Sequence, residues 1–83
     1  MTKLNLWVNP KTGEKRVYAN CNEIPEKLWF IKSASGPLAQ MQHTEANHQF
    51  ARQLGYTTLI DLGFHIANSM NVDFEAVKKL LED

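Results

Sequence analysis

Cysteine is scarce in this chain of 83 residues, which contains only Cys21. One cysteine cannot form an internal disulfide, whereas small secreted domains usually carry several disulfides. No window approaches the ~18–20 consecutive apolar residues of a membrane-spanning helix. The first ten residues hold one lysine and a short apolar span broken by Asn5, which is too polar for a signal peptide. These absences predict a cytoplasmic protein that makes no membrane contact.

Patterns typical of enzymes are also missing. No nucleophile elbow or phosphate-binding glycine loop occurs, and Cys21 lies in a polar stretch, residues 20–23, without a flanking catalytic pattern. The soft metal ligands other than Cys21 are three histidines, and the five-residue spacing of His43 and His48 does not match common zinc sites. A chain this short has little room to enclose a substrate pocket. We therefore expect no enzymatic activity, no cofactor and no metal site.

Net charge is absent too, since nine basic side chains balance nine acidic ones, but the two signs are unevenly distributed. Residues 1–35 carry six basic and three acidic groups, and residues 36–83 carry three basic and six acidic groups. If the two segments lie on different faces, the molecule has a charge dipole. Such a dipole favours oriented binding of a charged partner.

The first segment alternates between apolar and polar residues. This period of two predicts strands at residues 3–8 and 15–20. Between them, Pro10 cannot continue a central strand and Gly13 readily adopts a positive φ, so residues 9–14 should form a hairpin turn.

Residues 24–32 fit two structures. The aromatic run from Leu28 to Ile31 favours a third strand, whereas the spacing of Ile24, Leu28 and Ile31, with Pro25, also suits a helix. We favour the strand because the run is short and aromatic. Residues 33–37 should break whatever precedes them, and residues 38–43 give no clear pattern.

From Thr44 onward the apolar residues recur at helical spacing. Thr44, Thr58 and Asp73 are each suited to cap the start of a helix, and Gly55 and Asn71 are suited to end one. One apolar stripe per helix should be buried. Its members are Phe50, Leu54, Leu59, Leu62, Ile66, Phe74, Val77 and Leu81.

Strands followed by helices predict an α+β fold: an N-terminal antiparallel β-hairpin with a third strand, then two or three short helices on one face of the sheet. The chain is long enough for one domain, residues 1–83, strand-rich over 1–35 and helical over 44–83. A short sheet leaves open edges that proteins commonly pair or block, so we also expect a homodimer, formed through an edge strand or the uncovered sheet face.

Residues 47–66 have the outline of a DNA-binding helix-turn-helix. Ala51, Leu54, Gly55 and Phe64 fall at positions that this motif favours. However, Asp61 stands where an apolar core residue is expected, and residues 59–70 contain no Lys or Arg to contact phosphates and bases.

The hairpin offers a stronger candidate surface. If Leu4, Leu6, Val8, Val17 and Ala19 face the helices, then Lys3, Asn5, Trp7, Arg16 and Tyr18 share the other face. Alternatively, the large aromatic residues could form the covered face. The residues predicted to bind a partner are Trp7, Lys11, Lys15, Arg16, Tyr18 and Trp29.

Trp, Tyr and Arg dominate protein-binding hot spots, and aromatic and basic groups together also bind single-stranded nucleic acid. The leading hypothesis is a small non-enzymatic protein-binding module, an adaptor or inhibitor of the accessory or phage type. The alternative is a nucleic-acid-binding protein, which uses the basic aromatic hairpin or a degenerate helix-turn-helix at 47–66.

Overall fold

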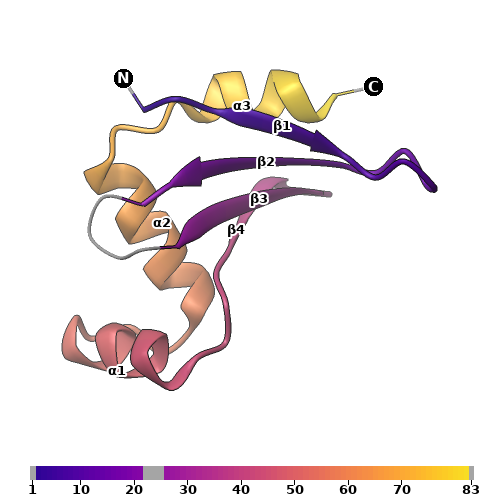
Figure 1. Cartoon of the computed structure of the whole chain (residues 1–83). Coiled ribbons are helices and arrows are strands. Elements are labelled where there is room, and N and C mark those ends of the chain that lie inside the picture. Colours follow the sequence, from indigo (N-terminus) through magenta and orange to yellow (C-terminus); the bar gives the residue numbers. More distant parts are fainter. Residues whose placement is uncertain (1, 22–25, 83) are drawn as a thin grey trace.

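The computed structural model describes residues 2–21 and 26–82, and its first half is a four-stranded antiparallel sheet (Figure 1). The strands are neighbours in chain order. They are β1 (Asn5–Val8), β2 (Lys15–Asn20), β3 (Lys27–Ser33) and β4 (Gly36–Gln40). Three helices follow the sheet, so the predicted α+β class is confirmed.

The predicted N-terminal hairpin is formed by β1 and β2, with Leu6 opposite Val17. Its turn is closed by the side chain of Asn9, whose Oδ1 accepts hydrogen bonds from the backbone N–H groups of Lys11 at 2.9 Å and Thr12 at 3.4 Å. Gly13 takes a φ of 76°, the left-handed conformation that glycine tolerates without strain. The turn chemistry of the sequence therefore fixes the register of the hairpin.

The third strand is confirmed over Lys27–Ser33, and the first residues of the predicted span, including Ile24 and Pro25, lie outside the described residues. A fourth strand was not predicted. The segment expected to end the strand region is instead a tight turn, in which Gly36 has a φ of 114° and Ser33 pairs with Gly36. β4 contains Pro37, which lacks an N–H group but is tolerated because β4 is an edge strand.

The helices begin where the capping residues predict. They are α1 (Glu45–Gln53), α2 (Leu59–Ser69) and α3 (Phe74–Leu81). The hydroxyls of Thr44 and Thr58 accept from backbone N–H groups at 3.2 and 3.1 Å, and the Asp73 carboxylate accepts from two. Gly55 and Asn71, at φ 86° and 57°, follow the ends of α1 and α2 as expected.

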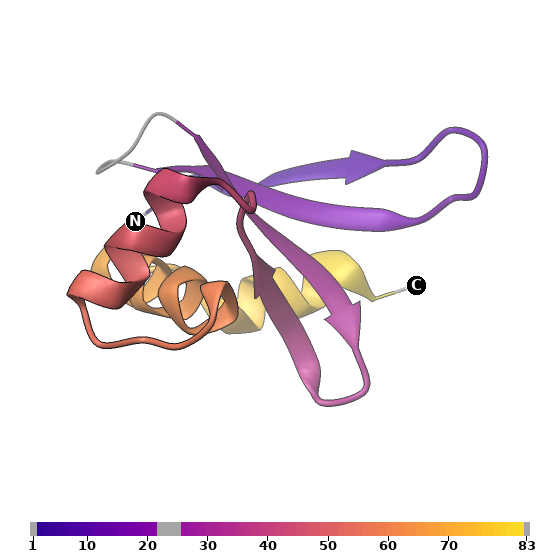
Figure 2. The same ribbon diagram turned by 90° about the horizontal axis from the view of Figure 1, so that it is seen from below.

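α2 and α3 lie on the same side of the sheet (Figure 2), and α1 packs against α2. α2 packs against β4, and α3 crosses β2, β3 and β4. Gly63 permits the close approach of α2, because a Cβ atom there would stand 3.0 Å from the Cβ of Ala39. Five of the strand residues that point to the helices are fully buried, and these are here called the covered face. They are Val17, Ala19, Leu28, Phe30 and Ala39.

Most of the predicted helical stripe is buried, including Leu59, Leu62, Ile66, Val77 and Leu81. Phe50 and Phe74 are only half-buried. The prediction for Leu54 is wrong: its side chain is 40% exposed. Leu54 is the C-terminal cap of α1, beyond the last full turn, and the helix buries Asn47 and Ala51 instead.

Asn47 connects α1 to the sheet through polar contacts. This residue is 3% exposed, and its amide nitrogen donates to the two Glu26 carboxylate oxygens at 3.0 and 3.2 Å. The same nitrogen donates to the Gln42 carbonyl at 2.8 Å. A buried amide that keeps such partners avoids a large desolvation cost.

β1 is the least covered strand of the sheet. Leu6 and Val8 point to the helix side, as predicted, but remain 45% and 44% exposed. The helices pack mainly against the other three strands, so only Leu4 at the start of this segment reaches the core. None of the helices in the described ranges combines the length and apolar character needed to cross a bilayer.

Candidate interaction surface

The sheet face opposite the helices gathers four of the residues predicted to bind a partner. The register places Trp7 beside Arg16 and Tyr18 beside Trp29. These residues alternate with the buried ones along each strand, so all four point away from the helices. The open face, as named here, consists of Asn5, Trp7, Arg16, Tyr18, Lys27, Trp29, Ile31, Leu38 and Gln40.

Three aromatic rings form a contiguous cluster across β1, β2 and β3. The centroids of Tyr18 and Trp29 lie 4.9 Å apart with the rings tilted by 45°. Trp7 meets Trp29 edge-on at 6.3 Å. Contacts of this geometry stabilise a pair by about 0.5–1.5 kcal/mol beyond the area buried. The cluster is therefore held in place before any partner arrives.

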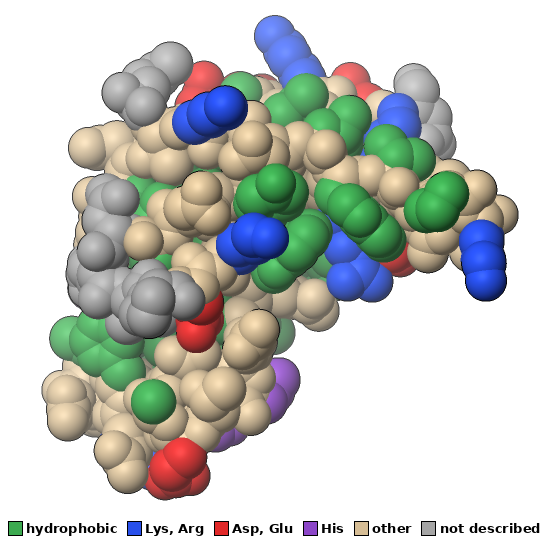
Figure 3. Space-filling view, viewed as in Figure 1, with side chains coloured by type: hydrophobic (Ala, Val, Ile, Leu, Met, Phe, Trp, Pro, Cys, Tyr) green, Lys and Arg blue, Asp and Glu red, His purple; other side chains and the backbone are tan. Residues whose placement is uncertain are grey.

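Two cations lie over these rings. The Arg16 guanidinium carbon is 5.7 Å from the centroid of the Trp7 ring, and the Lys27 ammonium is 4.9 Å from that of Tyr18. Arg16 also donates to the Glu14 carboxylate at 2.9 Å, at the rim of the face. The combination gives an apolar centre bordered by positive charge (Figure 3).

The alternative in which the aromatic residues form the covered face is wrong. Trp7 is 37% exposed, and Tyr18 and Trp29 are half-buried on the side away from the helices. The covered face instead uses smaller aliphatic residues and Phe30, because α2 and α3 approach the sheet closely. The large rings thus lie where the sheet has no second layer among the described residues.

The two lysines predicted near the hairpin tip lie apart from this cluster. Lys11 is in the exposed turn between β1 and β2. Lys15 points to the helix side, where its ammonium donates to the Glu82 carbonyl at 2.8 Å. That contact places a positive charge at the C-terminal end of α3, where it complements the helix dipole.

Four members of the open face were missed from the sequence. Lys27 and Ile31 are in phase with Trp29 on β3, so strand alternation alone could have identified them once that strand was accepted. Leu38 and Gln40 belong to β4, which pairs with β3. They could not be assigned without the fourth strand.

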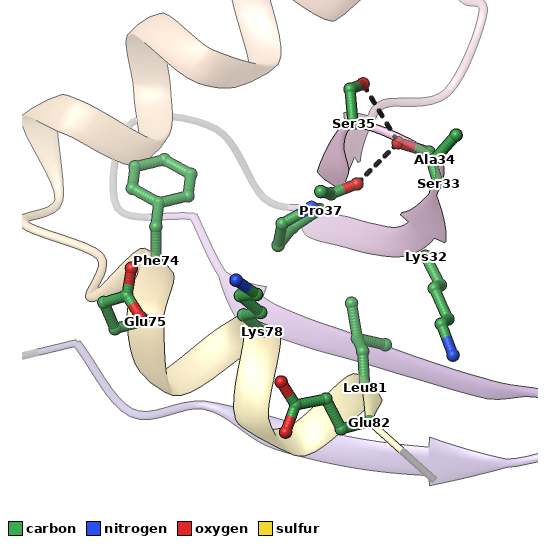
Figure 4. A pocket seen from close by; sticks show the side chains of 11 residues that line it. Lys32, Ser33, Ala34, Ser35, Pro37, Phe74, Glu75, Lys78, Leu81 and Glu82 are labelled. Carbon is green, nitrogen blue, oxygen red and sulfur yellow. Dashed lines mark hydrogen bonds between the residues drawn. The ribbon is translucent and has the colours of Figure 1, made fainter.

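Among the hollows that border the sheet, two lie near the open face and near the β3–β4 turn. One, of about 540 Å³, lies at the end of the open face between Cys21, Lys27 and Trp29. The other, of about 580 Å³, lies between the β3–β4 turn and α3 (Figure 4). Pro37 and Phe74 line this second hollow, together with charges of both signs such as Lys78 and Glu75, so no single ligand chemistry is favoured there.

His43 and His48 lie closer than their spacing suggested, with ring centroids 5.6 Å apart. Within residues 2–21 and 26–82, no group of three or more His, Cys, Asp or Glu side chains could hold a metal ion. His65 forms a hydrogen bond with Tyr56 instead, since its Nδ1 lies 3.1 Å from the Tyr56 hydroxyl.

The helix-turn-helix outline corresponds to α1, the turn with Gly55 and α2. Asp61, placed where the motif wants an apolar residue, is exposed, as is Ile60 beside it. Comparisons with protein-family models, curated proteins and solved structures found no match for the chain.

Proposed function

We propose that this protein is a small non-enzymatic binding module, an adaptor or inhibitor of the accessory or phage type, that acts in the cytoplasm and binds a partner protein through its open face. The observation that supports this best is the aromatic cluster of Trp7, Tyr18 and Trp29, held on an uncovered sheet and bordered by Arg16 and Lys27. Aromatic and Arg residues packed in this way supply most of the energy at protein-binding hot spots.

The partner's chemistry follows from the same surface. An apolar patch should cover the rings together with Ile31 and Leu38, which lie in one row of the sheet with Trp7 and Arg16. Acidic groups around that patch should face Arg16 and Lys27. Such rim charges mainly increase the association rate, while the buried aromatic contacts set the lifetime of the complex.

Nucleic acid is the alternative partner, through the same hairpin or through α1 and α2. A platform for single strands combines a positively charged groove with ring faces on which bases stack. Here the Arg16 guanidinium lies over the Trp7 ring and the Lys27 ammonium over the Tyr18 ring, so these ring faces are already occupied. On the helical side, residues 59–70 offer no Lys or Arg to a phosphate. These contacts favour a protein over nucleic acid.

The test compares capture of host proteins by the wild-type chain and by two double variants. Trp7→Ala/Tyr18→Ala removes open-face rings, and Leu54→Ala/Ile60→Ala removes two similarly exposed apolar side chains from the helical side. We expect one protein to be captured by the wild type and the helical variant but lost with the open-face variant. Circular dichroism must first show that both variants fold.

Equal capture by both variants would refute the open face as the binding surface. Loss of capture after nuclease treatment, with affinity that falls steeply as salt rises, would show nucleic acid to be the partner instead. Retention with the open-face variant and loss with the helical one would point to residues 47–66.

A further inference from the structure

The edge strand β1 exposes apolar side chains on both sides of the sheet. Leu6 and Val8 are 45% and 44% exposed on the helix side, and Trp7 is 37% exposed on the open face. β1 ends the sheet, so no strand among the described residues pairs with its outer edge. Most edge strands are protected by charged residues or proline, yet no charged residue occurs between Lys3 and Lys11.

The backbone of β1 offers hydrogen-bonding groups at that edge. The N–H of Asn9 donates to the Glu14 carbonyl at 2.8 Å, across the hairpin. Because antiparallel pairing alternates, Trp7 directs its N–H and C=O toward β2, and Leu6 and Val8 direct theirs outward. The opposite edge, β4, contains Pro37 and lacks a donor at that residue. β1 is therefore the edge suited to accept a further strand.

We propose that β1 pairs antiparallel with β1 of a second copy of this chain, about a two-fold axis at Trp7. This register sets Leu6 opposite Val8 of the other copy and places the two Trp7 residues side by side. Both sets of outward backbone groups are then paired. The interface is self-complementary, as a two-fold dimer requires, because apolar side chains meet apolar side chains on each side of the sheet.

The helix side supports a second copy as the occupant. α3 makes most of its sheet contacts with β2, β3 and β4, and Leu6 and Val8 keep 45% and 44% of their surface exposed. In the proposed register, Leu6 and Val8 from the two copies cover one another there. This contact covers the two side chains that each isolated chain leaves exposed there.

This dimer shares Trp7 with the proposed partner surface, but it leaves Tyr18 and Trp29 on the open face accessible, and Val8→Lys changes the helix side of β1 without altering the open face. Failure of the dimer test therefore leaves the proposed function standing, and loss of partner binding leaves the dimer standing.

Light scattering over a wide concentration range tests the proposal on the full chain. We expect a mass of twice 9.5 kDa that falls toward 9.5 kDa on dilution. Val8→Lys should raise the dissociation constant by more than about tenfold, because a two-fold interface contains the substitution twice. Ile60→Lys is the matched control, since Ile60 is 41% exposed on α2, and it should leave the mass unchanged. A wild-type mass of 9.5 kDa at every concentration, or equal effects of both variants, would overturn the proposal.

A crosslink tests the register. Residues directly opposite in a non-hydrogen-bonded antiparallel pair have Cα atoms about 4.5 Å apart, within the range of a disulfide. In a Cys21→Ser background, Trp7→Cys should therefore give a covalent dimer on oxidation, and Ile60→Cys should give none. A dimer by mass that Trp7→Cys does not crosslink would show that the two copies meet in another way.

Discussion

The two faces of the sheet use opposite kinds of side chain. The covered face is built from Val17, Ala19, Leu28, Ala39 and one ring, Phe30, all fully buried. The open face carries two tryptophans and a tyrosine that remain partly exposed. Ordinary core formation would bury the largest apolar side chains first, because they gain most from leaving water.

The difference shows that side-chain size on the covered face is limited by the helices. α2 approaches closely enough for Gly63 to lie against Ala39 and Leu28, so larger rings would not fit. The open face has no such limit, and its rings pack on one another instead. The stability of the fold should therefore depend on the covered face, whereas partner binding should depend on the open face.

The largest expected effect comes from Phe30→Ala. This ring is fully buried and contacts Phe74 edge-on at 5.9 Å, so its loss should lower the free energy of unfolding by about 3–5 kcal/mol. Urea unfolding measures the change. Trp29→Ala, one residue away on the other face, should lose less than half as much. Equal losses would mean that the open face is a second core.

Gly63→Val should have the next largest effect. Its side chain would press against Ala39, whose Cβ is only 3.0 Å from the position of the added Cβ. Overpacking of this kind destabilises a domain by about 1–3 kcal/mol, which outweighs the gain in helix propensity over glycine. Thermal unfolding measures it. A variant as stable as the wild type would show that α2 can move away from the sheet freely.

Trp7→Ala should cost less, about 0.5–1.5 kcal/mol, because the ring is on the edge strand and loses one ring contact with Trp29. The remaining Trp29 reports unfolding by fluorescence. Partner capture should fall much further than stability does. A loss of stability near that of Phe30→Ala would contradict the distinction between the faces.

Glu14→Ala should have the smallest effect. Its ion pair with Arg16 joins side chains that are 50% and 40% exposed, and such surface pairs contribute less than about 1 kcal/mol. Removing the carboxylate leaves Arg16 over Trp7 and makes the open face more positive. We expect unchanged unfolding in urea and faster association with an acidic partner. Slower association would show that Glu14 contacts the partner itself.

Local patterns in the sequence were sufficient for much of the fold. The hairpin follows from alternation and turn residues, and the three helix starts follow from Thr44, Thr58 and Asp73. β4 was missed because Gly36 and Pro37 are usually breakers, and their tolerance depends on an edge position that only the assembled sheet defines.

For the candidate surface, alternation correctly grouped Trp7, Arg16 and Tyr18, and cross-strand pairing added Trp29. It could not decide which face the helices cover, since that depends on how closely α2 and α3 approach. Lys15 was predicted with this group from its nearness to the hairpin tip. Lys15 contacts Glu82, which lies 67 residues further along the chain, and no local pattern reveals a contact between residues so far apart in sequence.

The amide of Asn47 has a consequence for how the molecule opens. α1 buries Ala51 and Asn47 and packs the half-buried Phe50 against the core, and its main helix contact is with α2. Its attachment to the sheet region runs through the hydrogen bonds of Asn47 to Glu26 and Gln42. Because few of its apolar side chains are fully buried, we expect α1 to open as a separate cooperative unit of low local stability. In native-state hydrogen exchange, the amides of α1 should therefore exchange by local opening, well before those of β2 and β3, which exchange only on global unfolding.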